Sequence, residues 1–185
     1  MPGRVLDAVT PLFYDRGVGA VGMAEVAAAA GTGKNALYRS FPSKDDLVLA
    51  YLERFAARIT TAREAALDGL PPDEALVELA RHTASLVTRR QSRGCPFRNY
   101  LRESHDTRGR PGRYALAQVR SLRDVVAGLS DRLAEREPDV DAARLAERVW
   151  LVLEGVFAAA PYPERVRLAA AGVDLVADLV AAARS

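Results

Sequence analysis

The sequence of 185 residues lacks the features that mark several classes of protein. Its single cysteine, Cys95, cannot form an internal disulfide, as is usual for proteins of a reducing cytoplasm. The first residues lack the apolar core and cleavage site of a signal peptide, and no apolar run reaches the ~20 residues of a membrane span. The net charge of only +2 does not by itself indicate a nucleic-acid-binding protein. We therefore expect a cytoplasmic protein with no membrane partner.

The sequence also lacks a convincing set of catalytic or metal-binding residues. Ser104, His105 and Asp106 are the residue types of a hydrolase triad, but consecutive helical residues point about 100° apart and cannot form a relay. Neither His82 nor His105 has carboxylates or thiols at a metal-ligand spacing. No glycine-rich phosphate loop follows a strand pattern. We expect no enzymatic activity, no metal and no cofactor.

The composition and the spacing of apolar residues in the chain are typical of helices. Aromatic residues make up 6% of it, alanine is abundant and long alternating strand patterns are absent. The sequence therefore predicts an all-α protein with a helix-turn-helix domain at residues 1–48 and a C-terminal helical bundle at 49–185. Apolar spacing and Gly or Pro breaks predict about nine helices, near residues 3–16, 23–30, 34–40, 43–67, 73–91, 96–105, 113–136, 141–159 and 163–183.

The predicted third helix has one buried and several exposed sides. At 100° per residue, Leu37 and Phe41 share one side and should point into the core, whereas Asn35, Tyr38 and Arg39 face outwards. Asn can pair with adenine and Arg with guanine in the major groove, and Tyr38 can reach a phosphate or a thymine methyl. Placed after a short helix and a glycine-containing turn, this segment has the pattern of a recognition helix.

Basic residues accompany this helix. Residues 31–44 include three basic residues and no acidic one. Lys34, Lys44 and the free backbone N–H groups after Ser43 suit phosphate contacts. Ser43 and Asp46 also have the spacing of a capping box, which predicts the start of the next helix. The alternative is that the same segment is a short core helix whose basic residues are merely solvated.

Residues 5–55 resemble the DNA-binding domain of the TetR family of repressors. The matching features are a Leu-Phe pair followed by Asp-Arg-Gly, a Glu-Val-Ala-x-x-Ala-Gly helix and turn, Lys34 with Leu37-Tyr38, and Phe41-x-Ser-Lys-x-x-Leu47. The resemblance implies that Tyr38 and Lys44 touch phosphates and that residues 32–35, 38 and 39 lie in or beside the major groove. We therefore predict DNA contacts from Thr32, Gly33, Lys34, Asn35, Tyr38, Arg39, Ser43 and Lys44.

Four positions depart from the family pattern. Gly22 and Gly33 stand at helix caps where the family often has Ser or Thr, Ala36 where it often has Thr, and Ser40 where it often has His. Glycine keeps most of the stability of an N-cap, so folding is not threatened, but a hydroxyl contact to phosphate is lost. The operator of a relative therefore cannot be transferred to this chain.

The last two predicted helices carry broad apolar stripes. The resemblance implies that the C-terminal bundle dimerises, so we expect a homodimer through residues 141–183, with an ordinary intrachain core as the alternative. The stripes comprise Leu145, Val149, Val152, Leu153, Val156 and Phe157, then Val166, Ala169, Ala170, Val173, Val176, Ala177 and Val180.

The resemblance also implies a small-molecule effector bound in the bundle. Such pockets combine apolar walls with a few polar anchors, although each aromatic residue is alternatively plain core. We predict an effector site from Phe97, Asn99, Tyr100, Leu101, His105, Tyr114, Trp150, Glu154 and Phe157, with His82 as a further anchor. The dense arginines of residues 81–113 indicate either a solvated face or an anionic effector. Cys95 either senses oxidants or is a buried thiol.

These patterns together predict a ligand-responsive transcriptional regulator. Two recognition helices about 34–36 Å apart can read a palindromic operator, and an effector that prefers a state with another spacing would release the DNA. The principal alternative is a dimeric interaction protein that kept the fold without binding DNA. An activator is compatible with the same sequence.

Overall fold

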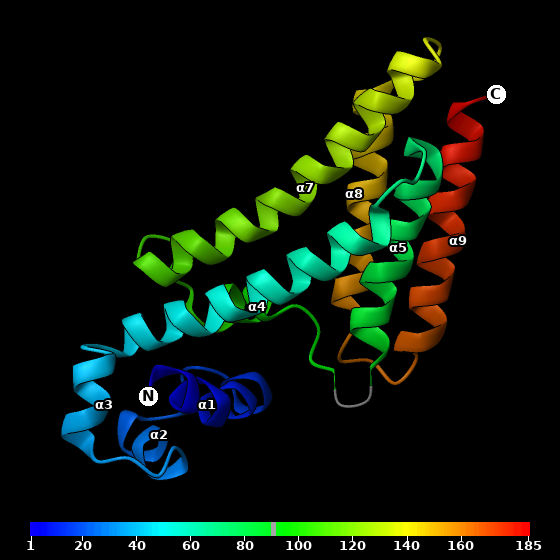
Figure 1. The fold of residues 1–185 in the computed structure, drawn as a ribbon. Helices are drawn as coiled ribbons and strands as arrows, with labels where there is room; N and C mark the ends of the chain where they lie inside the picture. The colour runs from blue at the N-terminus through cyan, green and yellow to red at the C-terminus, as the bar shows by residue number, and fades with distance from the viewer. Residues whose placement is uncertain (90–91) are drawn as a thin grey trace. The chain divides into compact units, whose positions relative to one another are not determined.

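A computed structural model describes residues 1–89 and 92–185, which contain nine helices and no strand (Figure 1). The prediction of an all-α protein with about nine helices is confirmed. The final residues of the predicted helix 73–91 lie outside the described residues. The helices are α1 (Pro2–Arg16), α2 (Met23–Ala29), α3 (Lys34–Ser40), α4 (Lys44–Leu67), α5 (Pro72–Thr88), α6 (Pro96–Ser104), α7 (Arg110–Arg136), α8 (Ala142–Ala158) and α9 (Arg165–Ala183).

The start of α7 differs from the prediction. The helix begins at Arg110, within the Gly- and Pro-containing stretch that was expected to separate helices. Pro111 is compatible with the first turn because its missing N–H would have no partner inside the helix there. Just before the helix, the Asp106 carboxylate accepts hydrogen bonds from the backbone N–H groups of Arg108 at 2.8 Å and Gly109 at 2.9 Å. These bonds order the turn and lower the pKa of Asp106.

The chain forms two compact units. The N-terminal unit comprises Met1–Arg58 and Pro96–Val119, and the bundle unit comprises Ile59–Cys95 and Arg120–Ser185. The N-terminal unit thus extends beyond the expected DNA-binding domain at residues 1–48 and also includes residues 96–119. The boundaries of the two compact units therefore differ from those of the two domains that the sequence predicted.

The N-terminal unit has an apolar core to which each of its first four helices contributes. Val9 and Phe13 of α1, Leu37 of α3 and Leu52 of α4 are all at most 2% exposed. The ring of Phe13 meets that of Tyr51 edge to face, with centroids 5.5 Å apart. Because α2 and α3 are each only seven residues long, packing on this core stabilises them more than their own hydrogen bonds do.

Leu37 is the residue through which α3 joins this core, and it is 0% exposed. We expect Leu37→Ala to lower the free energy of unfolding by about 2–5 kcal/mol, because it removes buried apolar area and leaves a cavity. Urea unfolding followed by circular dichroism measures the change, and hydrogen exchange locates it in residues 1–58. The exposed Lys34→Ala on the same helix is the control, with an expected change within about 0.5 kcal/mol. A loss below about 1 kcal/mol for Leu37→Ala would contradict this packing.

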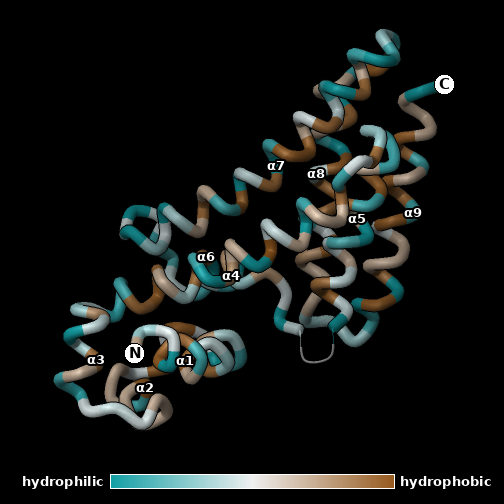
Figure 2. Tube along the Cα trace, in the orientation of Figure 1, coloured by the Kyte–Doolittle hydropathy of each residue, from teal (hydrophilic) through white to brown (hydrophobic). Residues whose placement is uncertain are grey.

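In the bundle unit, α5, α8 and α9 pack against one another. Figure 2 shows hydrophobic and hydrophilic segments alternating along these helices, as amphipathic helices require. At Gly172 of α9, an added Cβ would lie 2.4 Å from Cγ2 of Val156 on α8. The two helices therefore approach closely where α9 has no side chain.

This packing corrects the interpretation of the apolar stripes on α8 and α9. Many of the stripe residues face the core of the same chain, so the alternative of an intrachain core holds for them. They are Leu145, Val149, Leu153, Val156, Phe157, Ala169, Val176 and Val180. The stripe is broad because one helix buries its side against two neighbours, and periodicity alone does not say which neighbours belong to the same chain.

None of the helices in the described parts of the chain combines the length and the hydrophobicity that crossing a membrane requires.

Candidate nucleic-acid interface

Helix α3 presents its side chains as the sequence predicted. Leu37 and Phe41 are buried, at 0% and 6% exposure, whereas Tyr38 is 38% exposed and Asn35 and Arg39 are also exposed. The predicted orientation of this helix is therefore confirmed. Because the buried pair anchors the helix from behind, its polar side chains form an outward-facing edge.

The turn between α2 and α3 is built by backbone hydrogen bonds. The N–H of Gly31 donates to the carbonyl of Ala28 at 3.1 Å, and the N–H of Thr32 donates to that of Ala27 at 3.0 Å. Gly31 has φ +59°, a conformation that glycine adopts without strain. Gly33 caps α3 in an extended conformation and without a side-chain hydrogen bond, as the sequence predicted. Two short helices in contact across this turn make a helix-turn-helix.

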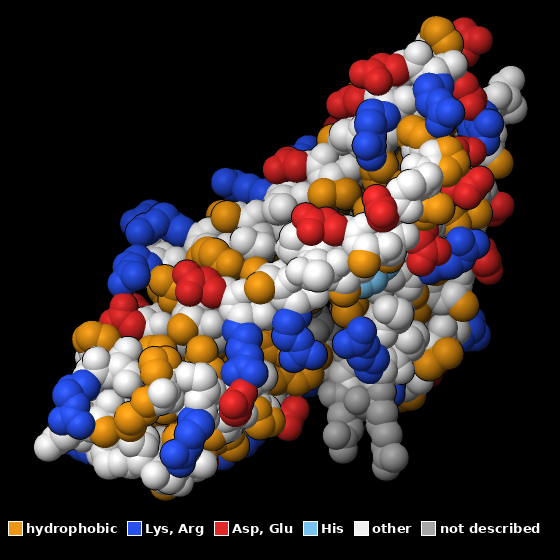
Figure 3. Space-filling model, in the orientation of Figure 1, with side chains coloured by type: hydrophobic (Ala, Val, Ile, Leu, Met, Phe, Trp, Pro, Cys, Tyr) orange, Lys and Arg blue, Asp and Glu red, His pale blue; other side chains and the backbone are white. Residues whose placement is uncertain are grey.

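The surface around α3 is locally basic. Helix α3 itself has no acidic residue, and the acidic Glu25 of α2 forms an ion pair with Arg16. Lys34 and Arg39 are exposed, and Figure 3 shows Lys and Arg side chains on the surface over α2 and α3. A duplex carries a phosphate charge every few ångströms, so such an edge favours its approach.

Ser43 is a predicted phosphate contact, but its hydroxyl and its backbone N–H already form hydrogen bonds in a helix cap. The Ser43 Oγ accepts a hydrogen bond from the Asp46 N–H at 3.1 Å and donates to Asp46 Oδ2 at 2.6 Å, and the Ser43 N–H donates to the same oxygen at 3.1 Å. The predicted capping box is thereby confirmed. The other phosphate candidate at this end of α4, Lys44, is half-buried.

Residues 96–119 contact the helix-turn-helix head, residues 1–58 of the same unit, at two points that sequence reasoning missed. The Val18 N–H, between α1 and α2, donates to Glu103 Oε2 of α6 at 3.2 Å. Arg110 of α7 donates to Asp46 Oδ1 at 2.7 Å. The Ser43 hydroxyl and, with it, Arg110 lower the pKa of Asp46 and so favour its charged form. No local pattern could have revealed these pairs, because their partners are 64 and 85 positions apart in the chain.

A cavity of about 210 Å³ lies beside these contacts within the N-terminal unit. Its lining combines the phosphate candidate Lys44 with α6 residues, among them Tyr100, whose pKa is raised by burial. The remaining lining residues are Val18, Gly19, Asp45, Val48, Glu103 and Ser104. Of the predicted effector residues, only Tyr100 lines this cavity.

The structure distributes the predicted effector residues over both compact units. Phe97, Asn99, Tyr100, Leu101, His105 and Tyr114 belong to the N-terminal unit, and Trp150, Glu154 and Phe157 belong to the bundle unit. Phe97, Tyr100 and Phe157 are buried, while His105 is exposed and adopts a positive φ of 52° at the end of α6. Cys95 is buried. Of the two interpretations of this residue, a buried thiol and an oxidant sensor, burial favours the first.

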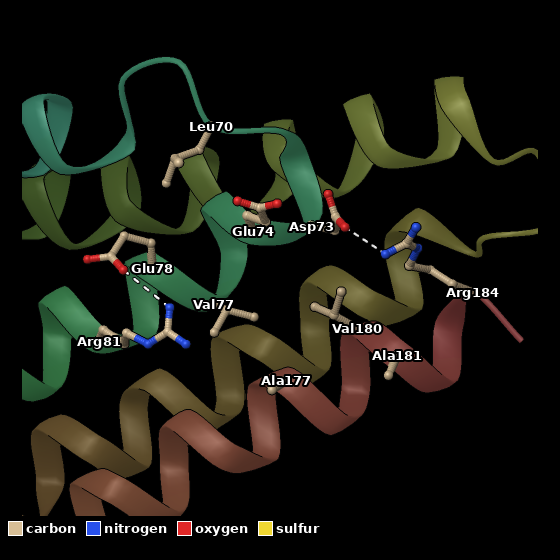
Figure 4. A pocket seen from close by; sticks show the side chains of 10 residues that line it. All are labelled: Leu70, Asp73, Glu74, Val77, Glu78, Arg81, Ala177, Val180, Ala181 and Arg184. Carbon is tan, nitrogen blue, oxygen red and sulfur yellow. Dashed lines mark hydrogen bonds and ion pairs between the residues drawn. The ribbon is translucent and has the colours of Figure 1, made fainter.

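The bundle unit also has a groove of about 520 Å³ along α5 and α9, which contains none of the predicted effector residues (Figure 4). Figure 4 shows that its arginines are already engaged. Arg184 contacts Asp73 at 2.6 Å, and Arg81 contacts Glu78 at 3.4 Å. Arg184 also contacts Glu137 at 2.8 Å, so it ties the last residues of the chain to the rest of the bundle unit. No group of three or more potential metal ligands occurs among residues 1–89 and 92–185.

Comparison with known proteins places these observations in context. Residues 5–51 match the family described as bacterial regulatory proteins, tetR family. The HTH-type transcriptional activator FasR of Mycolicibacterium smegmatis is 42% identical over 65 residues, which are 35% of this chain and 30% of FasR. The chain thus spans less than a third of the curated relatives that it matches.

Solved structures match over nearly the whole chain. SCO4454, a TetR-family transcriptional regulator from Streptomyces coelicolor, is similar with a TM-score of 0.90 and 26% identity, over 99% of this chain and 95% of that one. A regulator of the same type from Streptomyces avermitilis has a TM-score of 0.83 and 27% identity, over 98% and 97% of the two chains.

Proposed function

We propose that this chain is a TetR-family transcriptional regulator whose DNA-binding domain lies at residues 5–51, and that it represses transcription as a homodimer released from a palindromic operator by a small-molecule effector. The family assignment also makes it a regulator and not an enzyme. We place its action in the cytoplasm, where the operator is found.

One observation supports DNA recognition above all others: the exposed row of Asn35, Tyr38 and Arg39 on a helix anchored by Leu37 and Phe41. Asn and Arg are side chains that discriminate bases in the major groove, and tyrosine adds a phosphate or methyl contact. The other proposed contacts position the helix on the backbone without reading sequence. They come from Thr32, Gly33, Lys34, Ser43 and Lys44.

An exposed apolar face supports the homodimer through residues 141–183. Leu151 of α8 is 72% exposed, and Leu175 and Leu168 of α9 are 48% and 38% exposed. Large exposed apolar side chains on two packed helices are typical of surfaces that bind a partner. A second copy is the occupant that suits a palindromic operator, because a two-fold dimer presents two identical recognition helices.

The two contacts that hold the helix-turn-helix head, residues 1–58, suggest how effector binding reaches the DNA. Glu103 at the Val18 N–H and Arg110 at Asp46 connect α6 and α7 to the head. An effector that favours another position of residues 96–119 would carry the head with it and change the spacing of the recognition helices. Only a difference in effector affinity between the two states can drive this change.

We expect the purified protein to bind DNA from upstream of its own gene selectively, with affinity that falls at least roughly a hundredfold between 50 and 200 mM salt. Fluorescence anisotropy with that DNA and with a shuffled duplex of the same composition measures both properties. Equal binding of the two duplexes would contradict the proposal and favour a protein that retains the fold for another interaction. A reporter gene then separates repression from activation, the role in the name of FasR.

A further inference from the structure

Three basic side chains of the bundle unit contact no carboxylate among residues 1–89 and 92–185. Arg63 lies on α4, and His82 and Arg89 lie at α5 and its C-terminal end, seven residues apart and therefore on one face of that helix. Burial, followed by the nearby charges of Arg63 and Arg89, lowers the pKa of His82. The charges of Arg63 and Arg89 therefore act on the His82 ring.

Arg63 is the least usual member of this group. Its side chain is half-buried, and its guanidinium makes no hydrogen bond or ion pair within the described parts of the chain. Burial lowers its pKa, and the charge of Glu64, its neighbour in sequence, opposes that change without contacting it. A partly desolvated guanidinium without a partner is unfavourable in the free protein.

His82 adds a second unsatisfied group. Its Nε2 is buried and has no hydrogen-bond partner among the described residues. Among the described residues, Glu78 is the only acid whose charge raises the pKa of His82, and the Glu78 carboxylate contacts Arg81 at 3.4 Å. Buried polar atoms are nearly always paired in folded proteins, so this nitrogen is available to a partner from outside the chain.

The arginines of the groove in Figure 4 provide a contrast within the same unit. There Arg81 and Arg184 already contact carboxylates of the chain itself. That groove therefore offers an anionic ligand no unpaired arginine, although it is spacious. Arg63 and Arg89, in contrast, contact no carboxylate among the described residues.

We propose that Arg63, His82 and Arg89 bind the oxyanion head group of the effector, which is therefore a small molecule carrying a carboxylate or a phosphate. The guanidinium of Arg63 offers two parallel N–H donors to such a group, and Arg89 offers a second positive charge. His82 donates from the ring nitrogen that is otherwise unpaired. That the bound anion acts as effector rests on the proposed function, whereas the binding of the anion does not.

The test compares probes that share a six-carbon chain and differ in head group. Isothermal titration calorimetry of the full chain without DNA uses hexanoate, hexyl phosphate and hexan-1-ol. We expect at least one of the two anions to bind at least tenfold more tightly than the alcohol. Preference between hexanoate and hexyl phosphate identifies the head group.

Two substitutions then locate the site. Arg63→Met should weaken binding of the preferred anion at least tenfold and leave the melting temperature of the free protein unchanged or raised, because methionine needs no charged partner there. Arg132→Met removes the same charge from an exposed position of α7 and should leave anion binding unchanged.

The proposal is overturned if neither anion binds better than hexan-1-ol, or if Arg63→Met binds the anion as well as the unsubstituted protein does. A lowered melting temperature of Arg63→Met with unchanged anion affinity would also overturn it, because Arg63 would then be structural. Failure of the protein to bind any operator contradicts the proposed function alone. An anion that binds through Arg63 without altering operator affinity would contradict only its role as effector.

Discussion

Simultaneous replacement of Asn35, Tyr38 and Arg39 by alanine is expected to abolish selective operator binding while the protein remains folded and dimeric. Each lost base contact costs about 1–3 kcal/mol, so the affinity should fall at least roughly a hundredfold. Stability should change little, because all three side chains are exposed and the core residue Leu37 is kept. Anisotropy titrations with specific and shuffled DNA give the loss, and circular dichroism reports the fold.

The control for this variant is Arg58→Ala, which removes one positive charge from an exposed position of α4 in the same unit. It should reduce affinity for specific and shuffled DNA about equally, if at all, because a contact with phosphate carries no sequence information. If the triple variant still prefers its own promoter as strongly as the unsubstituted protein does, α3 is not the recognition helix. The proposed function would then be wrong.

The second large effect is expected at the exposed apolar face of α8 and α9. Replacing both Leu151 and Leu175 with glutamate should convert the dimer to a monomer across the concentrations at which the unsubstituted protein is dimeric. The physical reason is that burying unpaired carboxylates in an apolar interface costs several kcal/mol, and a two-fold axis places each substitution in the interface twice. Size-exclusion chromatography with light scattering measures the mass of the particle.

The monomer should also lose operator affinity, because two linked half-sites bind far more tightly than one. A matched control introduces two glutamates at exposed alanines of α4 in the bundle unit, Ala62→Glu with Ala65→Glu, and should remain dimeric. A persistent dimer in the Leu151 and Leu175 variant would place the interface elsewhere on the chain.

Features set by residues close together in the chain were predictable from the sequence. The capping box of Ser43 and Asp46 spans one helical turn, and the exposure of Asn35 opposite Leu37 follows from helical geometry. The start of α7 was misplaced because a proline and two glycines suggested a break, whereas proline is compatible with a first helical turn.

Features that depend on distant residues were not predictable in the same way. Nothing near Glu103 indicates that it accepts from the Val18 N–H, and nothing near Arg63 indicates that it lies beside His82 without a partner. The expected effector set combined residues that the structure assigns to two compact units, because aromatic character does not identify which core a side chain joins.

The amino-acid sequence by itself determined where the helices lie and which side of α3 faces outwards, since both depend on backbone geometry and on neighbours within one or two turns. Only the tertiary structure decided which apolar residues of α8 and α9 are buried within the chain and which, such as Leu151, remain exposed. It also decided which basic side chains contact a carboxylate and which do not. Hydrophobicity and charge are properties of a residue, but burial and pairing are properties of the residues around it, and folding brings those together from distant parts of the chain.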